Sequence, residues 1–382
     1  MEKRWIVKKR KHWIVFAIIW GMLVSLFALG VFGWAGEKEF DKETQEKMEK
    51  TLDKVMQDSR SPAAIVGVWA PGEGTWVVAK GKADIETGQL AQIKDKTRIG
   101  SITKTFVATA VLQLVDEGKI GLDDAVNKYL SFMPTGSKVT VHQLLNHSSG
   151  IFDAENDDPI FAKAVLENPS KKLSPQEIVE VSLAHKPYNQ PGKGAHYSNT
   201  NYKLLGMIVE EVTGKDLGVV IEEKIIDRLG LSNTVFATQP EMRGDRLHGY
   251  AVLESGLMDV TTERFIWILW ASGNVVSNLQ DQKKWARALG RGVLLSEKTH
   301  EEMMSWIEIT AALPGKFKYG LGVARVGDRF IGHAGAVNGY YGGIAYDPGT
   351  DTTIVLLFNK LAATEDAEVY ESFLHELIDI LH

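Results

Sequence analysis

A serine and a lysine three positions apart are the most informative pair in this chain. Ser101 and Lys104 belong to a Ser-Ile-Thr-Lys stretch that leads into an apolar run at 106–115. The run is long enough to predict a buried helix, and helical residues three apart share a face. The Lys104 amine can therefore reach the Ser101 hydroxyl, as a general base reaches a nucleophile in acyl transfer. Gly100 marks a turn, so we expect Ser101 at the helix N-terminus, with its N–H free to bind an oxyanion.

Lys104 can act as a base only if it loses its proton near neutral pH. That requires the pKa of Lys104 to fall from about 10.4 by about 3 units, and burial and a helix N-terminus both act in this direction.

Two further motifs follow Ser101 and Lys104 downstream. Tyr-x-Asn occurs only at Tyr197 and Asn199, and His-x-Gly only at His333 and Gly335. A phenol such as Tyr197 can return a proton to a leaving group.

In their order and rough spacing, the three motifs resemble the signatures of the serine β-lactamase and DD-peptidase superfamily, in particular its class C β-lactamase and DD-carboxypeptidase branch. The likeness covers about residues 45–380 and includes the stretches at 98–101, 141–150, 196–202, 319–322 and 332–341. The resemblance implies an α/β (α+β) fold, with an antiparallel sheet flanked by helices. It also implies a mainly helical subdomain inserted at about 105–270, and an active site between the two parts.

The resemblance assigns a role to each motif residue. Ser101 is the nucleophile, Lys104 its base and Tyr197 the proton donor to the leaving group. Asn199 would steer Lys104 and the substrate amide. Simpler alternatives are a packed aromatic residue for Tyr197 and a turn cap for Asn199.

The third motif supplies the strand that lines the cleft. His333 occupies the cationic position that is Lys in β-lactamases, where it would modulate Tyr197 or bind substrate. The alternative is a structural histidine at a sheet end. Ala334 and Gly335 are assigned to substrate binding. The backbone N–H groups of Ser101 and Ala336 are assigned to the oxyanion hole.

Three other groups of residues have weaker claims to function. Lys318 begins a Lys-Tyr-Gly stretch that is a rival third motif but lacks the expected small hydroxyl residue. His142 and His147 are five apart and are interpreted as structural. The stretch from Trp267 to Trp270 is interpreted as core, with the substrate cleft as the alternative.

The chain departs from the family pattern where a substrate carboxylate would bind. Penicillin-recognising members have hydroxyl residues at the positions of Ala334 and Ala336. In the DD-carboxypeptidase branch an arginine on the preceding strand also grips the carboxylate. That position aligns with Ala324, and Arg325 lies one residue later, on the opposite face of a strand. We therefore expect neutral substrates to be preferred.

The first 35 residues predict a membrane-spanning segment. Residues 1–12 carry six Lys and Arg residues against one acidic residue, a net charge of +5, and residues 13–34 are 22 uncharged positions. At about 1.5 Å per residue this run can cross a hydrocarbon core of about 30 Å. The basic tip keeps the short end inside the cell. We expect a cytoplasmic tip at 1–12, an anchor or signal segment at 13–35, and an extracytoplasmic domain at 36–382, which is secreted if the segment is cleaved.

Composition excludes several classes of protein. The absence of cysteine rules out disulfides and thiolate metal sites. The whole chain carries −6, so the part outside the basic tip carries −11, which argues against nucleic-acid binding. No Gly-x-Ser-x-Gly elbow, Walker loop, Rossmann fingerprint or His-Glu-x-x-His helix occurs. We expect no metal or cofactor and a small-molecule or peptide substrate, and the oligomeric state is left open.

Periodicity places strands at both ends of the exported domain. Residues 37–58 predict an amphipathic helix, and 63–70 and 75–79 a β-hairpin. Further strands are expected at 319–326, 329–333, 340–346 and 352–358, and a final helix at 364–381.

The leading interpretation of the sequence is an extracytoplasmic serine hydrolase that forms an acyl-serine on a peptide, amide or ester. The alternatives are a true D-Ala-D-Ala carboxypeptidase or class C β-lactamase, and a noncatalytic penicillin-binding or wall-binding module.

Overall fold

The computed structural model describes residues 38–168, 172–253, 256–262, 266–310, 316–361 and 364–381. The predicted basic tip and the predicted membrane segment at 13–35 lie outside these ranges. Among the described residues, no helix has both the length and the apolar character needed to cross a membrane.

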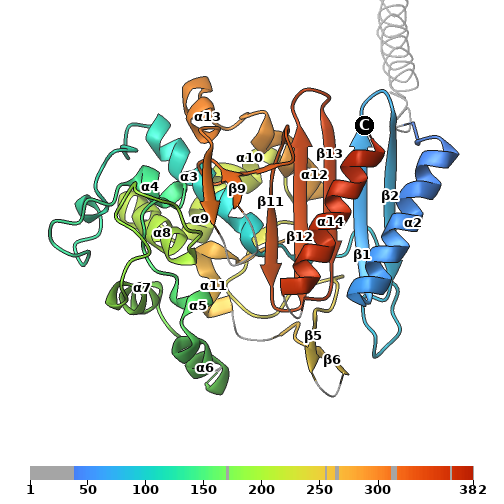
Figure 1. Cartoon of the computed structure of the whole chain (residues 1–382), viewed down its shortest axis with the longest axis horizontal. Helices are drawn as coiled ribbons and strands as arrows, with labels where there is room; N and C mark the ends of the chain where they lie inside the picture. Colours follow the sequence, from blue (N-terminus) through green and yellow to red (C-terminus); the bar gives the residue numbers. More distant parts are fainter. Residues whose placement is uncertain are drawn as a thin grey trace, which may run out of the picture.

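One eight-stranded antiparallel sheet organises the molecule, in the order β2-β1-β13-β12-β11-β10-β9-β8 (Figure 1). Its strands are β1 (Ala63–Ala70), β2 (Gly74–Gly81), β8 (Ile307–Thr310), β9 (Lys316–Tyr319), β10 (Ala324–Val326), β11 (Phe330–Val337), β12 (Tyr340–Asp347) and β13 (Thr352–Phe358). The N-terminal hairpin pairs with the C-terminal strands through β1 and β13. The predicted sheet, built from both ends of the chain, is confirmed.

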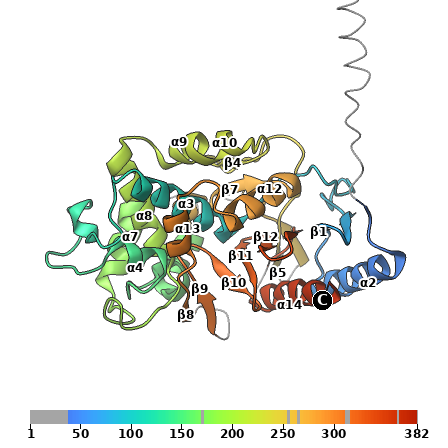
Figure 2. The ribbon, with the colours of Figure 1, turned by 90° about the horizontal axis from the view of Figure 1, so that it is seen from above.

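Helices cover both faces of this sheet. The predicted terminal helices are α2 (Lys42–Ser59) and α14 (Thr364–Ile380), which lie side by side on one face (Figures 1 and 2). Their apolar stripes, including Leu52 and Phe373, pack in one buried cluster with strand residues. The opposite face is covered by α12 (Leu279–Gly290), whose Trp285 stacks on Phe106 at 4.0 Å between ring centroids.

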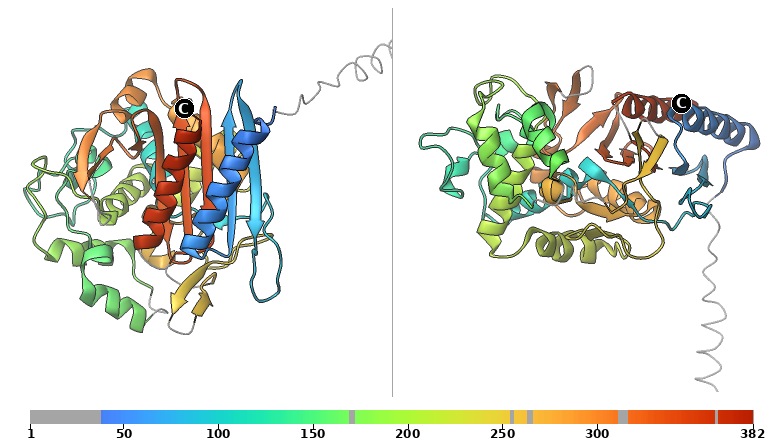
Figure 3. Two further views of the ribbon diagram at one scale, coloured as in Figure 1. Left: turned by 45° about the vertical axis from the view of Figure 1, so that its right-hand side comes forward. Right: turned by 90° about the horizontal axis from the view of Figure 1, so that it is seen from below.

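The segment between β2 and β8 is mainly helical and lies beside the sheet (Figure 3). Its helices are α3 (Thr103–Asp116), α4 (Val141–Leu145), α5 (Ala154–Asp157), α6 (Pro159–Glu167), α7 (Pro175–Ala184), α8 (Asn199–Thr213), α9 (Leu217–Ile221), α10 (Asp227–Leu229) and α11 (Ile266–Leu269), with α13 (Glu297–Met303) following α12. Small sheets join β3 (Thr97–Arg98), β7 (Val275–Ser277) and β4 (Val235–Phe236), and separately β5 (Tyr250–Leu253) and β6 (Gly256–Asp259).

The predicted buried helix at 106–115 is confirmed. Every residue of α3 from Thr103 to Leu114 is buried, because the helix lies between the sheet layer and the other helices. A helix that is buried on all sides has no polar face, which explains the continuous apolar run. Because α3 is buried in this way, the residues at its N-terminus have a fixed position.

Two of the predicted strands differ from those observed. The strand expected at 319–326 is two strands, β9 and β10, because the chain turns between them at Gly322, which has φ of 89° and no room for a side chain against Ala108. The strand expected at 329–333 extends to Val337 as β11. The whole third motif therefore lies within a strand rather than at its end.

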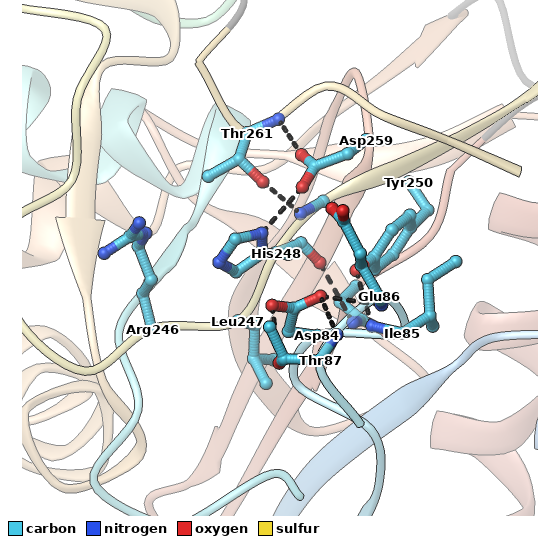
Figure 4. A network of polar contacts seen from close by, with 12 residues as sticks. Asp84, Ile85, Glu86, Thr87, Arg246, Leu247, His248, Tyr250, Asp259 and Thr261 are labelled. Atoms are coloured by element: carbon cyan, nitrogen blue, oxygen red, sulfur yellow. Dashed lines mark hydrogen bonds and ion pairs between the residues drawn. The ribbon is translucent and has the colours of Figure 1, made fainter. Parts of the chain in front are cut away.

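A polar network joins the turn after β2 to the β5–β6 hairpin (Figure 4). The His248 ring lies 2.6 Å from the Asp259 carboxylate, and the N–H of Ile85 donates to the Tyr250 hydroxyl at 2.9 Å. The carboxylate of Asp84 accepts from the Thr87 hydroxyl. None of these residues lines the cavities at Ser101. The network therefore holds a loop in place and is not part of the candidate site.

Candidate active site

Ser101 lies in a single 3-10 turn, Gly100–Ile102, that leads directly into α3. The helix expected to start at Ser101 starts at Thr103, so the nucleophile lies just ahead of its first turn. Gly100 has φ of 50°, and a Cβ there would lie 2.9 Å from the Ala336 nitrogen. A Cβ on Gly335 would lie 1.9 Å from the Ile99 carbonyl oxygen and 2.9 Å from the Ser101 nitrogen. Two glycines therefore allow β11 to approach the main chain of Ser101, as an oxyanion hole built from Ser101 and Ala336 would need.

Lys104 lies within hydrogen-bonding distance of the predicted nucleophile. Its Nζ is 2.9 Å from the Ser101 hydroxyl oxygen and 3.0 Å from the Ser272 carbonyl oxygen, which accepts from it. The side chain has no exposed surface. Burial lowers its pKa from 10.5 to about 7, with Glu155 opposing this shift and Lys203 adding to it. Near neutral pH Lys104 therefore has a substantial neutral fraction that can accept the Ser101 proton.

Tyr197 lies beside the same lysine, with its ring centroid 5.0 Å from the Lys104 Nζ. Its hydroxyl is buried and makes no hydrogen bond of standard geometry within the described chain. Burial raises its pKa well above the usual value, and the Ser101 hydroxyl only partly offsets this. Tyr197 therefore keeps its proton at neutral pH. It is placed to donate that proton, and Lys104 is the better base.

Asn199 is the first residue of α8 and lines the cleft beside Ser101. Its N–H donates to the Asp153 carboxylate at 2.8 Å, and its side-chain oxygen is buried without a hydrogen bond from any described residue. The hydrogen bonds of Lys104 go to Ser101 and Ser272 instead. Contact between Asn199 and a substrate amide remains a prediction.

His333 lies on β11 and is fixed as a neutral ring. Its Nε2 is 2.9 Å from the Tyr319 hydroxyl, and its Nδ1 donates to the Ala334 carbonyl. Burial, with a smaller effect of Lys104, lowers its pKa to about 3. The position expected to carry a cation therefore carries an uncharged imidazole at neutral pH. Its partner Tyr319 comes from the rival Lys-Tyr-Gly motif, which thus contributes to the site without replacing His333.

His147 packs beneath Tyr197, with ring centroids 4.3 Å apart. It is buried, has φ of 62°, and its Nδ1 accepts from the N–H of Ser198 at 3.1 Å. Burial, followed by the charge of Lys104, holds its pKa well below the usual value. The geometry agrees with a structural role, which here is to support the Tyr197 ring.

Ser101 lies where two cavities meet. The larger, about 780 Å³, is lined by Tyr197, His333 and Ala334 and extends to α14. The smaller, about 380 Å³, has a mainly apolar wall and does not include Tyr197. The apolar wall is formed by Phe161, Ala162, Val165, Ile268, Leu269 and Val337. Ser101, Asn199 and Ala336 line both cavities.

The strand register at the expected carboxylate site places Ala324 and Arg325 as the sequence predicted. Ala324 pairs with Gly332 and Arg325 with Ile331, so the two side chains point to opposite faces of β10. The Arg325 Nε donates to the Asp328 carbonyl at 2.7 Å, and its guanidinium lies 5.7 Å from the Trp306 ring centroid. Arg325 lines the larger cavity but is held by these contacts.

Three residues near Lys104 were not identified from the sequence. The buried Lys203 of α8 forms an ion pair with Glu155 of α5, and the Ser272 hydroxyl lies 3.5 Å from the Lys203 Nζ. The sequence did contain a signal for Lys203, since it follows Asn199 by four residues and so shares its helix face.

The stretch from Trp267 to Trp270 contributes both to core packing and to the lining of the cleft. Trp270 fills the space over Gly206, while Ile268 and Leu269 line the smaller cavity. Within the described residues no group of His, Asp and Glu is arranged to hold a metal ion.

Comparison with known proteins agrees with this geometry. The β-lactamase family model matches residues 48–376. A D-stereospecific amidohydrolase from Streptomyces sp. is 31% identical, covers 86% of this chain and 98% of its own, and superposes with a TM-score of 0.74. The D-amino acid amidase of Ochrobactrum anthropi SV3, complexed with L-phenylalanine amide, is 27% identical over 89% and 100% of the two chains, with a TM-score of 0.77.

Curated bacterial relatives match most of this chain. The putative penicillin-binding protein PbpX of Bacillus subtilis is 25% identical over 85% of this chain and 79% of its own. Protein flp of Staphylococcus aureus is 24% identical over 83% of this chain, which spans 63% of the length of that relative. The chain belongs to the β-lactamase family.

Proposed function

We propose that this protein is an extracytoplasmic hydrolase that forms an acyl-Ser101 intermediate on amides or esters with an apolar acyl group and an uncharged leaving group. The observation that carries the proposal is the fully buried Lys104 amine at 2.9 Å from the Ser101 hydroxyl, with a pKa of about 7. A neutral amine in contact with a hydroxyl is what general-base activation of serine requires.

The groups at Ser101 account for each proton in the reaction. Neutral Lys104 takes the hydroxyl proton as Ser101 attacks the substrate carbonyl carbon, and the N–H groups of Ser101 and Ala336 stabilise the oxyanion. Tyr197 donates its proton to the departing nitrogen or oxygen, and Lys104 returns a proton to Tyr197. Water then attacks the acyl-serine by the same transfers in reverse.

The two cavities give the substrate a direction. Tyr197 lines only the larger cavity, so a leaving group that receives its proton must lie there. The acyl group lies on the other side of the carbonyl carbon and extends into the smaller cavity. Because Phe161 and Val165 form part of its wall, this cavity favours an apolar acyl side chain of up to aromatic size.

The leaving-group side favours an uncharged substrate. Ala324, Ala334 and Ala336 offer no hydroxyl or guanidinium to a carboxylate, and His333 is neutral there. The amidase and amidohydrolase likenesses support amino-acid amides as the substrate class. Lys318 and Arg325 also line the larger cavity and are the cations that would hold a carboxylate if the protein is a carboxypeptidase or β-lactamase.

Intact-mass analysis tests the proposed chemistry. A fluorophosphonate should add one label to the wild type and none to Ser101→Ala, with peptide mapping to Ser101. A short panel of aryl-acyl esters, D- and L-amino-acid amides, D-alanyl-D-alanine peptides and benzylpenicillin then ranks the substrate classes. Absence of labelling by every reagent would favour a noncatalytic wall-binding module.

A substitution in the smaller cavity tests the acyl assignment. Ala162→Phe should fill this cavity and lower kcat/KM for phenylacetyl esters by about tenfold or more, with acetyl esters little changed. Leu374→Phe, in the larger cavity, is the matched control and should leave this ratio unchanged. Equal losses for both esters in Ala162→Phe would contradict the placement of the acyl group in the smaller cavity.

A reporter fused after His382 tests the predicted export, because it should be active only outside the cytoplasm.

A further inference from the structure

The buried ion pair between Lys203 and Glu155 has no part in the proton transfers described above. The Lys203 side chain has no exposed surface and that of Glu155 is 6% exposed. Glu155 lines the smaller cavity together with Ser101 and Ser272. Burying two charges costs free energy that their attraction only partly offsets, so a pair placed beside a catalytic centre calls for a functional explanation.

The ion pair is connected to the base through Ser272. The Ser272 carbonyl accepts from Lys104 at 3.0 Å, and its hydroxyl oxygen lies 3.5 Å from the Lys203 Nζ. That hydroxyl donates its own proton to the Leu269 carbonyl at 2.6 Å. Ser272 ends a short 3-10 turn that begins at Trp270, a non-glycine residue with φ of 37°. Lys104 and Lys203 therefore both bind a turn that is held in an uncommon backbone conformation.

The charges of the pair act on Lys104 with opposite signs. Ionised Glu155 favours the Lys104 ammonium, whereas Lys203 disfavours it, and Asp153 adds to the effect of Glu155. Burial raises the pKa of Glu155 itself to about 7, so its carboxylate is only partly ionised at neutral pH and gains charge as the pH rises. The other titratable groups that face Lys104 are uncharged at neutral pH. They are Tyr197, Tyr202, His147 and His333. The protonation of the base thus depends on a small set of charges. Among the described residues that act on it, Lys203 is the only cation besides Lys104 itself.

We propose that Glu155 and Lys203 are positioning residues for the base, which hold the Ser272 carbonyl against Lys104 and balance one charge against another beside its amine. This inference rests on the proposed function, since it takes Lys104 as the base of Ser101. It assigns opposite effects to the two members of one ion pair. A merely structural pair would instead give the same effect when either member is removed.

The test is the pH dependence of Ser101 labelling by a neutral fluorophosphonate, measured for the folded wild type and variants. In Glu155→Gln the remaining Lys203 charge should move the acid limb of the rate to lower pH by about one unit. In Lys203→Met the limb should move to higher pH. The double variant removes both charges and should lie between the two. It also remains informative if a single variant with an unpaired buried charge fails to fold.

Glu223→Gln is the matched control, because Glu223 pairs with Lys215 at the surface, where both side chains are about half exposed. It should leave the acid limb unchanged. Shifts in the same direction in both single variants, or slower labelling with an unmoved limb in every variant, would overturn the proposal. Failure of the proposed function is distinguishable, since the wild type itself would then show no labelling at Ser101.

Discussion

The Lys104 amine lies 2.9 Å from the Ser101 hydroxyl and is completely buried, so the residue that we propose as the base also lowers the stability of the fold. Its pKa is about 7 in the folded protein and 10.5 when exposed, as in the unfolded chain. Between these values the unfolded chain binds more protons, so the unfolding free energy contributed by Lys104 rises with pH from about 7 to 10.5. Below pH 7 the full penalty is present.

Lys104→Met should therefore strongly lower turnover while raising the melting temperature at pH 7. Loss of the base should lower kcat by about 10²–10⁴-fold, and a buried methionine removes the penalty of a charged amine. Calorimetry at pH 7 and 10 checks the rise in melting temperature, which should be smaller at the higher pH. In the wild type, kcat/KM should fall as the pH drops below about 7. A melting temperature lowered at both pH values would contradict the electrostatic account.

His333 should contribute no titration to the activity between pH 5 and 8. Its pKa of about 3 keeps the ring neutral over that range, and its bond to Tyr319 holds one tautomer. His333→Gln should therefore lower activity without moving the acid limb of kcat/KM. A limb displaced in this variant would show that the imidazole titrates during catalysis. NMR of the ring carbons in the wild type provides an independent measurement.

The missing carboxylate contacts predict a substrate preference. Charge-assisted hydrogen bonds contribute about 1.5–3 kcal/mol each, so substrates that depend on several of them should react orders of magnitude more slowly here. Matched ester pairs with and without a free carboxylate on the leaving group measure this as a ratio of kcat/KM. Installing Thr at Ala334 and Ala336 should narrow the gap. A tenfold wild-type preference for the carboxylate member would instead indicate that Lys318 or Arg325 binds it, and would favour the carboxypeptidase alternative.

Gly335→Ala should disrupt the oxyanion hole. The added Cβ would lie 1.9 Å from the Ile99 carbonyl oxygen, so β11 must move away from Ser101. We expect a lower melting temperature and a loss of about 10²–10³ in kcat, as on removal of an oxyanion donor. Gly343→Ala on the neighbouring strand is the control, since its Cβ would meet Leu356 at an ordinary 3.7 Å. Similar losses of kcat in Gly335→Ala and Gly343→Ala would show that the close approach of Gly335 to Ser101 is not what catalysis requires.

The helices and strands were largely predictable because their signals are local. The apolar run after Lys104, the amphipathic terminal helices and the apolar strand at 352–358 are all present in the structure. The exceptions have local packing causes that no periodicity reports. Gly322 divides one expected strand because its turn packs against Ala108, and β11 continues to Val337 because it runs along the turn of Ser101.

The sequence by itself determined the candidate catalytic residues, because Ser101 and Lys104 are neighbours on one short segment and the other two motifs each occur once. Only the tertiary structure decided their charges and surroundings. The neutrality of His333, the lowered pKa of Lys104 and its coupling to Lys203 and Glu155 all arise from burial among segments far apart in the chain. Burial and charge interactions depend on distances in three dimensions, which residue types and spacing do not contain.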